Sequence, residues 1–204
     1  MRDEPEAPAG ASIRADEVRA DTLARAATGT SELDALLGGG VVEGSSVLVY
    51  GRRGSGKSRL AFRWAAQRRC LVAHAEMSRE VTRAIVESTG ADLRRVYLLR
   101  TLDGWQAEAE RVGARSVVLD SLAASVDAVA EMRAARDWAE RRRAVVWCIA
   151  HETKSGDHRG SSELAHWADY EWRLSPVEAG SARVEVVKAR LDPGGAVVVR
   201  LACQ

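Results

Sequence analysis

Short apolar runs recur along the chain, and polar or amphipathic stretches separate them. The runs are Ser46–Tyr50, Cys70–Ala75, Ser116–Leu119 and Ala144–Ala150. Such runs are typical of strands that helices cover on both faces. Between them, Arg79–Thr89 and Glu131–Arg143 have the character of helices. Strands that alternate with helices predict an α/β domain, built on a mainly parallel, twisted sheet flanked by helices.

The pattern changes near the carboxyl end, where apolar and polar residues alternate more often. Three stretches, Asp169–Leu174, Arg183–Ala189 and Ala196–Leu201, are expected to be strands. Pro193-Gly194-Gly195 has the composition of a turn between the last two. We therefore expect a hairpin there, which gives the sheet a carboxyl-terminal antiparallel extension.

The amino-terminal residues follow neither pattern. Residues 1–11 are polar and rich in proline and alanine, and Ser12 is a possible cap for a short helix over Ile13–Arg25. We expect residues 1–25 to form a flexible arm and residues 26–204 to form the folded domain. The arm either docks on a neighbouring subunit, and so mediates assembly, or is frayed.

Composition narrows the class of protein without naming a partner. The chain has 204 residues, of which 46% are hydrophobic, as expected for one globular domain. Its net charge of +1 neither requires nor excludes nucleic acid. Cys70, Cys148 and Cys203 lack metal-site spacing and are interpreted as reduced thiols. Because the chain has no long apolar run and no signal-peptide pattern, we expect a cytoplasmic protein with no membrane partner.

One stretch carries specific chemistry, Gly51-Arg52-Arg53-Gly54-Ser55-Gly56-Lys57-Ser58. It fits the phosphate-binding loop G-x-x-x-x-G-K-[ST], in which main-chain N–H groups surround phosphates and the lysine reaches the β- and γ-phosphates. A chance glycine-rich turn is the alternative, but a buried strand precedes this loop and a helical pattern follows it, as the motif requires. We therefore expect ATP and Mg²⁺ as cofactors. The expected nucleotide contacts are Gly51, Gly54, Ser55, Gly56, Lys57, Ser58 and Arg59.

A carboxylate at the tip of a later strand supplies the second half of a metal site. The apolar run Ser116–Leu119 ends in Asp120, followed by Ser121. Taken alone, an aspartate after a strand is a weak signal, but its distance from the phosphate loop strengthens it. We expect Asp120 and the Ser58 hydroxyl to hold Mg²⁺, the aspartate usually through water.

The block Thr28–Gly40, which reads TGTSELDALLGGG, resembles the corresponding block of the RecA-like ATPase core, shared by RadA, KaiC and the DnaB-type hexameric helicases. The resemblance continues through the phosphate loop to the carboxyl end. It implies a RecA-like P-loop NTPase fold and an Mg-dependent ATPase that assembles into rings or filaments.

The resemblance also implies roles for two strand-end residues. Glu76, in Glu76-Met77-Ser78, stands where the family has a glutamate that polarises the attacking water, with Glu80 as the alternative in another register. His151 stands where RadA and KaiC relatives place a histidine that senses the γ-phosphate. From the residues alone, a glutamate like Glu76 is usually a helix-capping residue, and a lone histidine like His151 is more often an ordinary polar residue at a strand end.

Two further basic segments correspond to family features. Lys188 and Arg190 resemble a K-x-R segment that reaches the neighbouring subunit's γ-phosphate, although a strand-end K-x-R is ordinarily a solvated edge. The segment Lys154–Ser162 resembles the DNA-facing loop, with Lys154, Arg159 and Gly160 as candidate contacts. A loop that gates the ATP site without meeting DNA is the alternative.

Three functions remain open from sequence. The leading one is an oligomeric RecA-like ATPase that acts on single-stranded DNA in recombination, repair or replication. The second is a nucleotide-dependent regulator, like KaiC or a recombinase paralogue, that binds a protein partner. Its support is the near-neutral charge and the absence of Lys and Arg from Leu122–Ala130. A small-molecule kinase is the third, but it explains neither the Thr28–Gly40 block nor Lys188 and Arg190.

Overall fold

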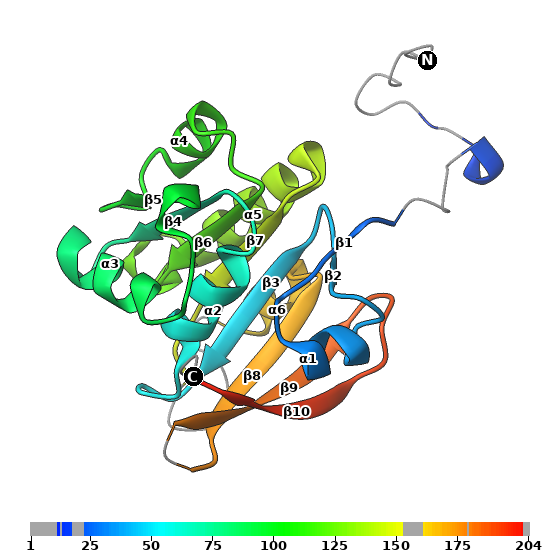
Figure 1. Cartoon of the computed structure of the whole chain (residues 1–204). Helices are drawn as coiled ribbons and strands as arrows, with labels where there is room; N and C mark the ends of the chain where they lie inside the picture. Colours follow the sequence, from blue (N-terminus) through cyan, green and yellow to red (C-terminus); the bar gives the residue numbers. More distant parts are fainter. Residues whose placement is uncertain (1–11, 13, 18–22, 153–160, 179, 202–204) are drawn as a thin grey trace.

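The structure is a computed structural model that describes residues 12, 14–17, 23–152, 161–178 and 180–201. Its strands and helices follow one another as the sequence predicts, strand and helix alternating through the middle of the chain (Figure 1). The helices are α1 Ser31–Leu36, α2 Lys57–Ala65, α3 Arg79–Glu87, α4 Trp105–Arg111, α5 Ala128–Arg142 and α6 Ser161–Trp167, with short 3-10 turns at Ala15–Glu17, Leu93–Arg95 and Leu122–Ala124. The strands are β1 Arg25–Ala26, β2 Val41–Val42, β3 Ser46–Gly51, β4 Cys70–His74, β5 Val96–Leu99, β6 Ser116–Asp120, β7 Val145–Ile149, β8 Tyr170–Pro176, β9 Ser181–Ala189 and β10 Gly195–Arg200.

The main sheet has eight strands in the order β10-β9-β8-β3-β7-β6-β4-β5. All neighbours from β8 to β5 are parallel, whereas β9 pairs antiparallel with β8 and β10 antiparallel with β9. The predicted mainly parallel sheet with a carboxyl-terminal antiparallel extension is therefore confirmed. A parallel sheet brings the carboxyl ends of its strands to one edge, which is where ligands bind in such folds.

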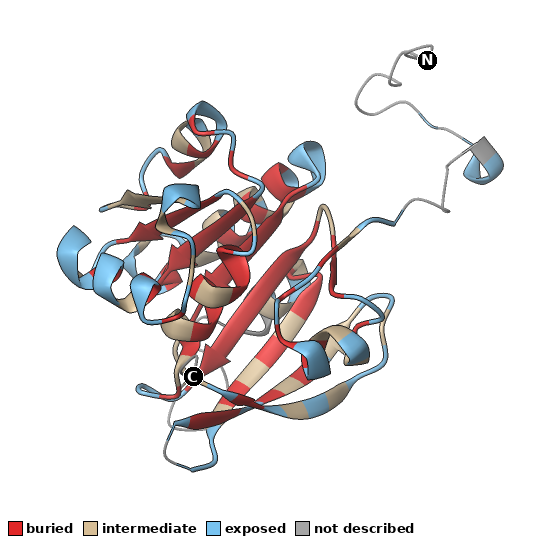
Figure 2. Cartoon of the chain, in the orientation of Figure 1, coloured by how far each residue is buried: buried red, intermediate tan, exposed pale blue. Residues whose placement is uncertain are grey.

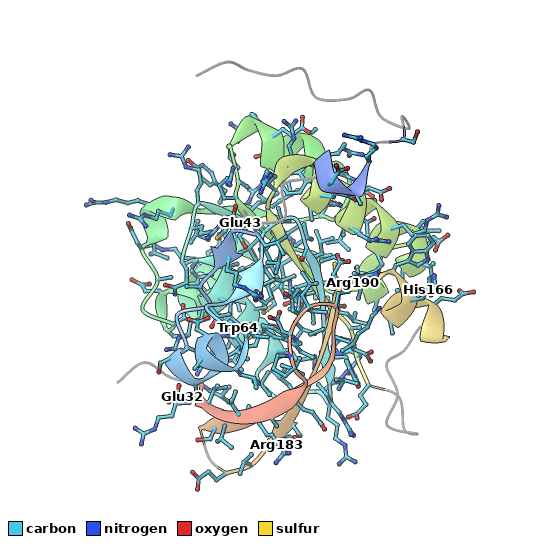
Figure 3. All side chains as sticks on the ribbon, turned by 90° about the vertical axis from the view of Figure 1, so that its right-hand side faces the viewer. Glu32, Glu43, Trp64, His166, Arg183 and Arg190 are labelled. Atoms are coloured by element: carbon cyan, nitrogen blue, oxygen red, sulfur yellow. The ribbon has the colours of Figure 1, made fainter. Side chains whose placement is uncertain are left out.

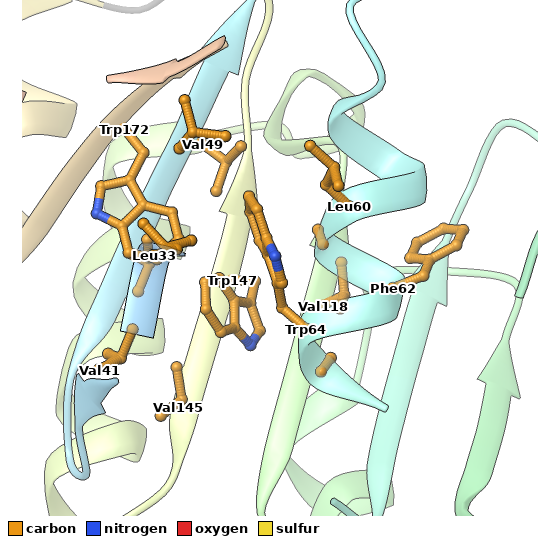
Figure 4. Packing of buried hydrophobic residues seen from close by; sticks show 14 of the residues in the cluster. Leu33, Val41, Val49, Leu60, Phe62, Trp64, Val118, Val145, Trp147 and Trp172 are labelled. Atoms are coloured by element: carbon orange, nitrogen blue, oxygen red, sulfur yellow. The ribbon is translucent and has the colours of Figure 1, made fainter. Parts of the chain in front are cut away.

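Helices cover both faces of the parallel part, and its central strands β3, β4, β6 and β7 are buried along their whole length (Figure 2). Because side chains alternate along a strand, Val47 and Val49 of β3 pack with α2, while Leu48 and Tyr50 pack with α4 and α5 on the other face. Trp64 of α2 meets Trp147 of β7 and Trp172 of β8, with ring centroids 5.4 and 5.1 Å away (Figure 4). This aromatic cluster fixes α2, and so the loop before it, against the centre of the sheet.

The described part of the amino-terminal arm contains one 3-10 turn, Ala15–Glu17, and Arg25, the last residue of the possible helix Ile13–Arg25, belongs to strand β1. Residues 13 and 18–22 of that possible helix lie outside the described residues. The Arg25 guanidinium donates to the carbonyl of Gly40 at 2.9 Å and lies 2.7 Å from Asp192. These contacts could not be predicted from the sequence, because the partners of Arg25 are 12 or more residues away in the chain.

Candidate functional site

The carboxyl ends of β3, β4 and β7 surround a cavity of about 580 Å³. Seven of the predicted site residues line it, namely Gly54, Gly56, Lys57, Ser58, Arg59, Glu76 and His151. They come from segments far apart in sequence, so their meeting is a property of the fold. Glu80, the alternative to Glu76, is instead exposed in the first turn of α3.

The phosphate loop needs glycine at two positions. Gly51 has φ 151°, and a Cβ there would lie 2.1 Å from the carbonyl oxygen of Leu174. Gly56 caps the amino end of α2 with φ 88°, a left-handed conformation that other residues seldom adopt. The helix therefore starts at Lys57, and its free N–H groups face the cavity, as phosphate binding requires.

Lys57 is almost completely buried, at 5% exposure. Its ammonium donates hydrogen bonds of 2.8 Å to the carbonyl oxygens of Gly51 and Arg52. Burial lowers the pKa of Lys57, and the nearby carboxylates of Asp120 and Glu152 act in the opposite direction. The loop thus holds the lysine against its own main chain at the wall of the cavity.

Asp120 is also buried, at the tip of β6 beside β4. Its Oδ2 lies 3.2 Å from Nε2 of His74, but the two groups are not aligned for a hydrogen bond, and Oδ2 has no hydrogen-bond partner among the described residues. Half-buried Ser58 stands in the first turn of α2 and borders the cavity. A hydroxyl and a carboxylate with a free oxygen are oxygen ligands of the kind that Mg²⁺ prefers.

Glu76 follows β4 and is exposed to the cavity. The buried hydroxyl of Ser121 donates to its Oε1 at 3.1 Å, which limits how the carboxylate turns. The main-chain N–H of Glu76 donates to Nδ1 of His74 at 3.1 Å. Sequence reasoning missed both contacts, because His74 lies within an apolar run and Ser121 gives no signal of its own.

His151 lies two residues beyond the end of β7 and borders the same cavity. Burial, and next the charge of Lys57, lower the pKa of His151, which favours the neutral imidazole. Its Nδ1 is buried and has no hydrogen-bond partner among the described residues.

Three buried polar atoms without hydrogen-bond partners among the described residues indicate whether the residues of this site fit a nucleotide and its metal ion. Ser55 Oγ, Asp120 Oδ2 and His151 Nδ1 are buried and lack partners in the described part of the chain. Such atoms are costly unless something hydrogen-bonds or coordinates them. A phosphate and a hydrated Mg²⁺ offer the matching chemistry, so the residues fit both groups.

An ion pair between Glu152 and Arg173 supports the phosphate loop and was not predicted from the sequence. Glu152 is buried beneath the loop, and Arg173 of β8 donates to its Oε1 from Nη2 at 2.7 Å and from Nε at 3.2 Å. The main-chain N–H of Glu152 donates to the carbonyl of Gly51. The pairing of β3 with β8, which places Tyr50 opposite Arg173, creates this support and could not be read from the sequence.

Lys188 and Arg190 lie away from the cavity. β9 runs antiparallel to β8, so Lys188 stands opposite Glu171, at the end of the sheet opposite to the phosphate loop. Lys188 donates to the carbonyls of Ala165 and Ala168 at 2.6 Å, and Arg190 Nε donates to Asp169 at 2.8 Å, beside the helix that carries His166 (Figure 3). Neither reaches the cavity of its own chain, so their proposed role in a neighbour's site stays a prediction.

The remaining predicted residues and features are quickly placed. Lys154, Arg159 and Gly160 lie outside the described residues. Cys70 and Cys148 are buried and free, and burial raises the pKa of the Cys70 thiol to about 12. Across the described ranges, no cluster of His, Cys, Asp and Glu has metal-site geometry, and no helix is long and apolar enough to cross a bilayer.

Comparison with known sequences also points to a nucleotide-binding core of the RecA-like kind. The family model of the KaiC ATPase matches residues 26–102. The DNA repair protein RadA of Listeria monocytogenes is 31% identical over 172 residues, covering 75% of this chain and 38% of that protein. RadA of Mycobacterium tuberculosis is 31% identical over 184 residues, covering 80% and 38%. The chain thus spans less than two fifths of the length of these relatives.

Comparison with solved structures supports the fold. A KaiC-like protein from the hyperthermophilic archaeon Pyrococcus horikoshii superimposes with a TM-score of 0.71 over 86% of this chain and 93% of that one, at 15% identity. The phosphate loop, the strand order, the family model, the RadA relatives and the solved structure agree with one another. The chain is therefore a RecA-like P-loop ATPase core, of the kind found in the KaiC and RadA proteins.

Proposed function

We propose that this protein binds ATP with Mg²⁺ and hydrolyses it, and that it works as a homo-oligomer on single-stranded DNA in recombination, repair or replication. The observation that carries the proposal is the meeting of Lys57, Ser58, Glu76 and His151 at one cavity, with Asp120 buried at the adjoining strand tip. A small-molecule kinase is disfavoured because it gives no role to the Thr28–Gly40 block.

Each residue has a distinct task in the proposed reaction. The loop N–H groups and Lys57 bind the β- and γ-phosphates, and Ser58 and Asp120 hold the metal ion. Mg²⁺, when bound, neutralises charge on the phosphate oxygens. Glu76, which Ser121 orients, accepts a hydrogen bond from the attacking water. The His151 ring donates a hydrogen bond to a γ-phosphate oxygen.

The DNA part of the proposal is supported by the RadA relatives, which are described as DNA repair proteins. ATP hydrolysis should be measured with and without single-stranded DNA over a range of protein concentrations, beside Lys57→Ala. We expect DNA to stimulate hydrolysis, specific activity to rise with concentration, and Lys57→Ala to be inactive. Absence of ATP binding by the wild-type protein would refute the proposal.

The candidate DNA contacts have a matched test. Changing Lys154 and Arg159 to alanine removes two cations from the proposed loop, whereas Arg183→Ala removes an exposed cation from β9. We expect only the first change to weaken DNA binding and to reduce its dependence on salt concentration. Equal losses of DNA binding in the two variants would mean that the DNA is attracted by the overall charge of the protein and not by the proposed loop.

A second candidate function is a nucleotide-dependent regulator that binds a protein partner. One observation favours it: the segment from Leu122 to Ala130 carries no Lys or Arg, and Val126 within it is fully exposed. An exposed apolar residue on a segment without Lys or Arg suits a protein contact better than a phosphate backbone. ATP binding with no response to DNA would favour this function over the first.

A further inference from the structure

His74 is a buried imidazole for which the proposed reaction has no task. It is the last residue of β4 and is only 5% exposed. Its side chain points to the same side of the sheet as Val72, toward α2, and its ring meets Phe62 edge-on at 6.3 Å. The β4–β6 register sets His74 directly opposite Asp120. A leucine or valine would fill such a place without the cost of burying polar atoms.

The hydrogen bonds of His74 fix the position of its proton. Nδ1 accepts the main-chain N–H of Glu76 at 3.1 Å and that of Met77 at 3.0 Å. A nitrogen that accepts two N–H groups cannot carry a proton itself, so the ring proton is on Nε2. Nε2 lies 3.2 Å from Oδ2 of Asp120, a close electrostatic contact that in this structure is not aligned as a hydrogen bond. The two ring nitrogens therefore face two different parts of the site.

These contacts close into a ring of four residues, which we call the His74 circuit: His74, Glu76, Asp120 and Ser121. Nδ1 of His74 holds the main chain of Glu76, and Nε2 faces Asp120. Ser121, next to Asp120 in the chain, donates its hydroxyl to the Glu76 carboxylate. The circuit joins the ends of β4 and β6, and it contains both acidic residues of the site.

We propose that His74 is a positioning residue with two separable tasks. Through Nε2–H it orients the Asp120 carboxylate toward the metal, and through Nδ1 it holds the turn that presents Glu76. The inference rests on the proposed function, because it assigns Asp120 to Mg²⁺ and Glu76 to the attacking water. Outer-shell partners of this kind typically alter metal affinity or activity by roughly 10- to 100-fold.

Two conservative variants separate the tasks. In His74→Asn the amide oxygen can take the place of Nδ1 and accept the two N–H groups, but nothing reaches Asp120. In His74→Gln the longer amide can donate to Asp120 from the place of Nε2, but the acceptor for the turn is lost. The assays are Mg²⁺ titration with a fluorescent, non-hydrolysable ATP analogue, binding of that analogue in EDTA, and hydrogen exchange of the Glu76 and Met77 amides.

The two variants should give opposite results. For His74→Asn we expect Mg²⁺ affinity to fall about tenfold or more, with amide exchange as in the wild type. For His74→Gln we expect wild-type Mg²⁺ affinity and faster exchange at both amides. Analogue binding in EDTA should be unchanged in both, which also shows that the variants fold. Wild-type Mg²⁺ affinity in a folded His74→Asn variant would overturn the metal task.

A measurement on the wild-type protein needs no variant. Nitrogen NMR of the imidazole should show the proton on Nε2 and an unprotonated Nδ1 in the nucleotide-free protein. A proton on Nδ1 would overturn the inference even if both variants failed to fold. If Mg²⁺ had no effect on nucleotide binding by the wild-type protein, the metal-binding part of the proposed function would be wrong. The tautomer of His74 and the exchange of the two amides would still test the His74 circuit independently.

Discussion

The alternation of side chains along the strands decides which residues face the candidate site. Val72, Val118 and Ile149 point toward α2, and two positions further along each strand stand His74, Asp120 and His151. Since side chains alternate along a strand, these three polar residues face the same side as the phosphate loop. On this side of the sheet, apolar residues along the three strands pack in the core, and polar residues follow them at the strand ends; of these, His151 lines the cavity.

His151 gives a pH dependence with a defined sign. Its pKa is lowered from the usual 6.5 in the folded protein, mainly by burial. The unfolded chain therefore takes up a proton as the pH falls through about 6.5, whereas the folded protein takes it up only at lower pH. We expect this residue to contribute a loss of unfolding free energy as the pH falls below about 6.5.

Urea unfolding at a series of pH values measures this loss. His151→Gln should flatten the decline between about pH 7 and pH 5 relative to the wild type. His166→Gln, an exposed histidine on α6, is the control and should leave the decline unchanged. Identical pH profiles for wild type and His151→Gln would contradict the prediction.

Gly51 and Gly54 give a matched pair for the loop. An alanine at Gly51 would collide with the carbonyl of Leu174, whereas a Cβ at Gly54 meets nothing within 4 Å. Both have positive φ, so both substitutions carry backbone strain of about 1–2 kcal/mol. The collision should add about 1–3 kcal/mol at Gly51 alone. Chemical denaturation should therefore rank Gly51→Ala well below Gly54→Ala, and equal stabilities would refute the steric argument.

At the scale of elements, the aromatic cluster ties α2 to two strands. Trp147 of β7 donates its indole N–H to the Ser116 hydroxyl at 2.9 Å, while the indole N–H of Trp172 in β8 has no hydrogen-bond partner among the described residues. Both rings are buried and both have Trp64 as a neighbour.

Phenylalanine substitutions distinguish the two tryptophans. Both substitutions leave a smaller ring in the same cluster, but Trp147→Phe also removes the hydrogen-bond donor of the buried Ser116 hydroxyl. We expect Trp147→Phe to lower the unfolding free energy by about 1 kcal/mol more than Trp172→Phe. Thermal or chemical denaturation of both variants measures the difference, and a larger loss in Trp172→Phe would contradict it.

The elements themselves could largely be predicted from sequence, because buried parallel strands and the phosphate loop leave strong local patterns. Glu76 and His151 were placed by resemblance, and the structure puts both at the cavity. What could not be predicted depends on pairing between distant strands. His74 reads as part of an apolar run until β4 is set beside β6, and Arg173 has no visible partner until β8 is set beside β3.

At the scale of the whole molecule, the phosphate loop and Arg190 lie at opposite ends of the sheet strands. Arg190 is held by Asp169, which also lies 3.5 Å from Arg136, and its side chain remains 48% exposed. If Arg190 has the proposed role in hydrolysis, it acts in the site of another copy, because it does not reach the cavity of its own chain. The proposed shared site therefore requires a head-to-tail contact between unlike surfaces.

Mixing two inactive variants tests this arrangement. Lys57→Ala and Arg190→Ala should each hydrolyse ATP poorly, but their equal mixture should regain activity. Random assembly creates about a quarter of interfaces with both an intact loop and an intact arginine. Arg136→Ala, which removes the other arginine near Asp169, should stay near wild-type activity. An assembled mixture with no recovered activity would exclude the shared site.

The antiparallel return of β9 to the far end of the sheet has a consequence for stoichiometry. Under the proposed shared site, one terminal subunit of an open head-to-tail chain would bind ATP with no neighbour to complete its site, however long the chain becomes. A closed ring has no such subunit. In short open assemblies, the largest fraction of the bound ATP would therefore stay unhydrolysed. Lengthening the chain, or closing it into a ring, would by itself raise the rate of ATP hydrolysis per subunit.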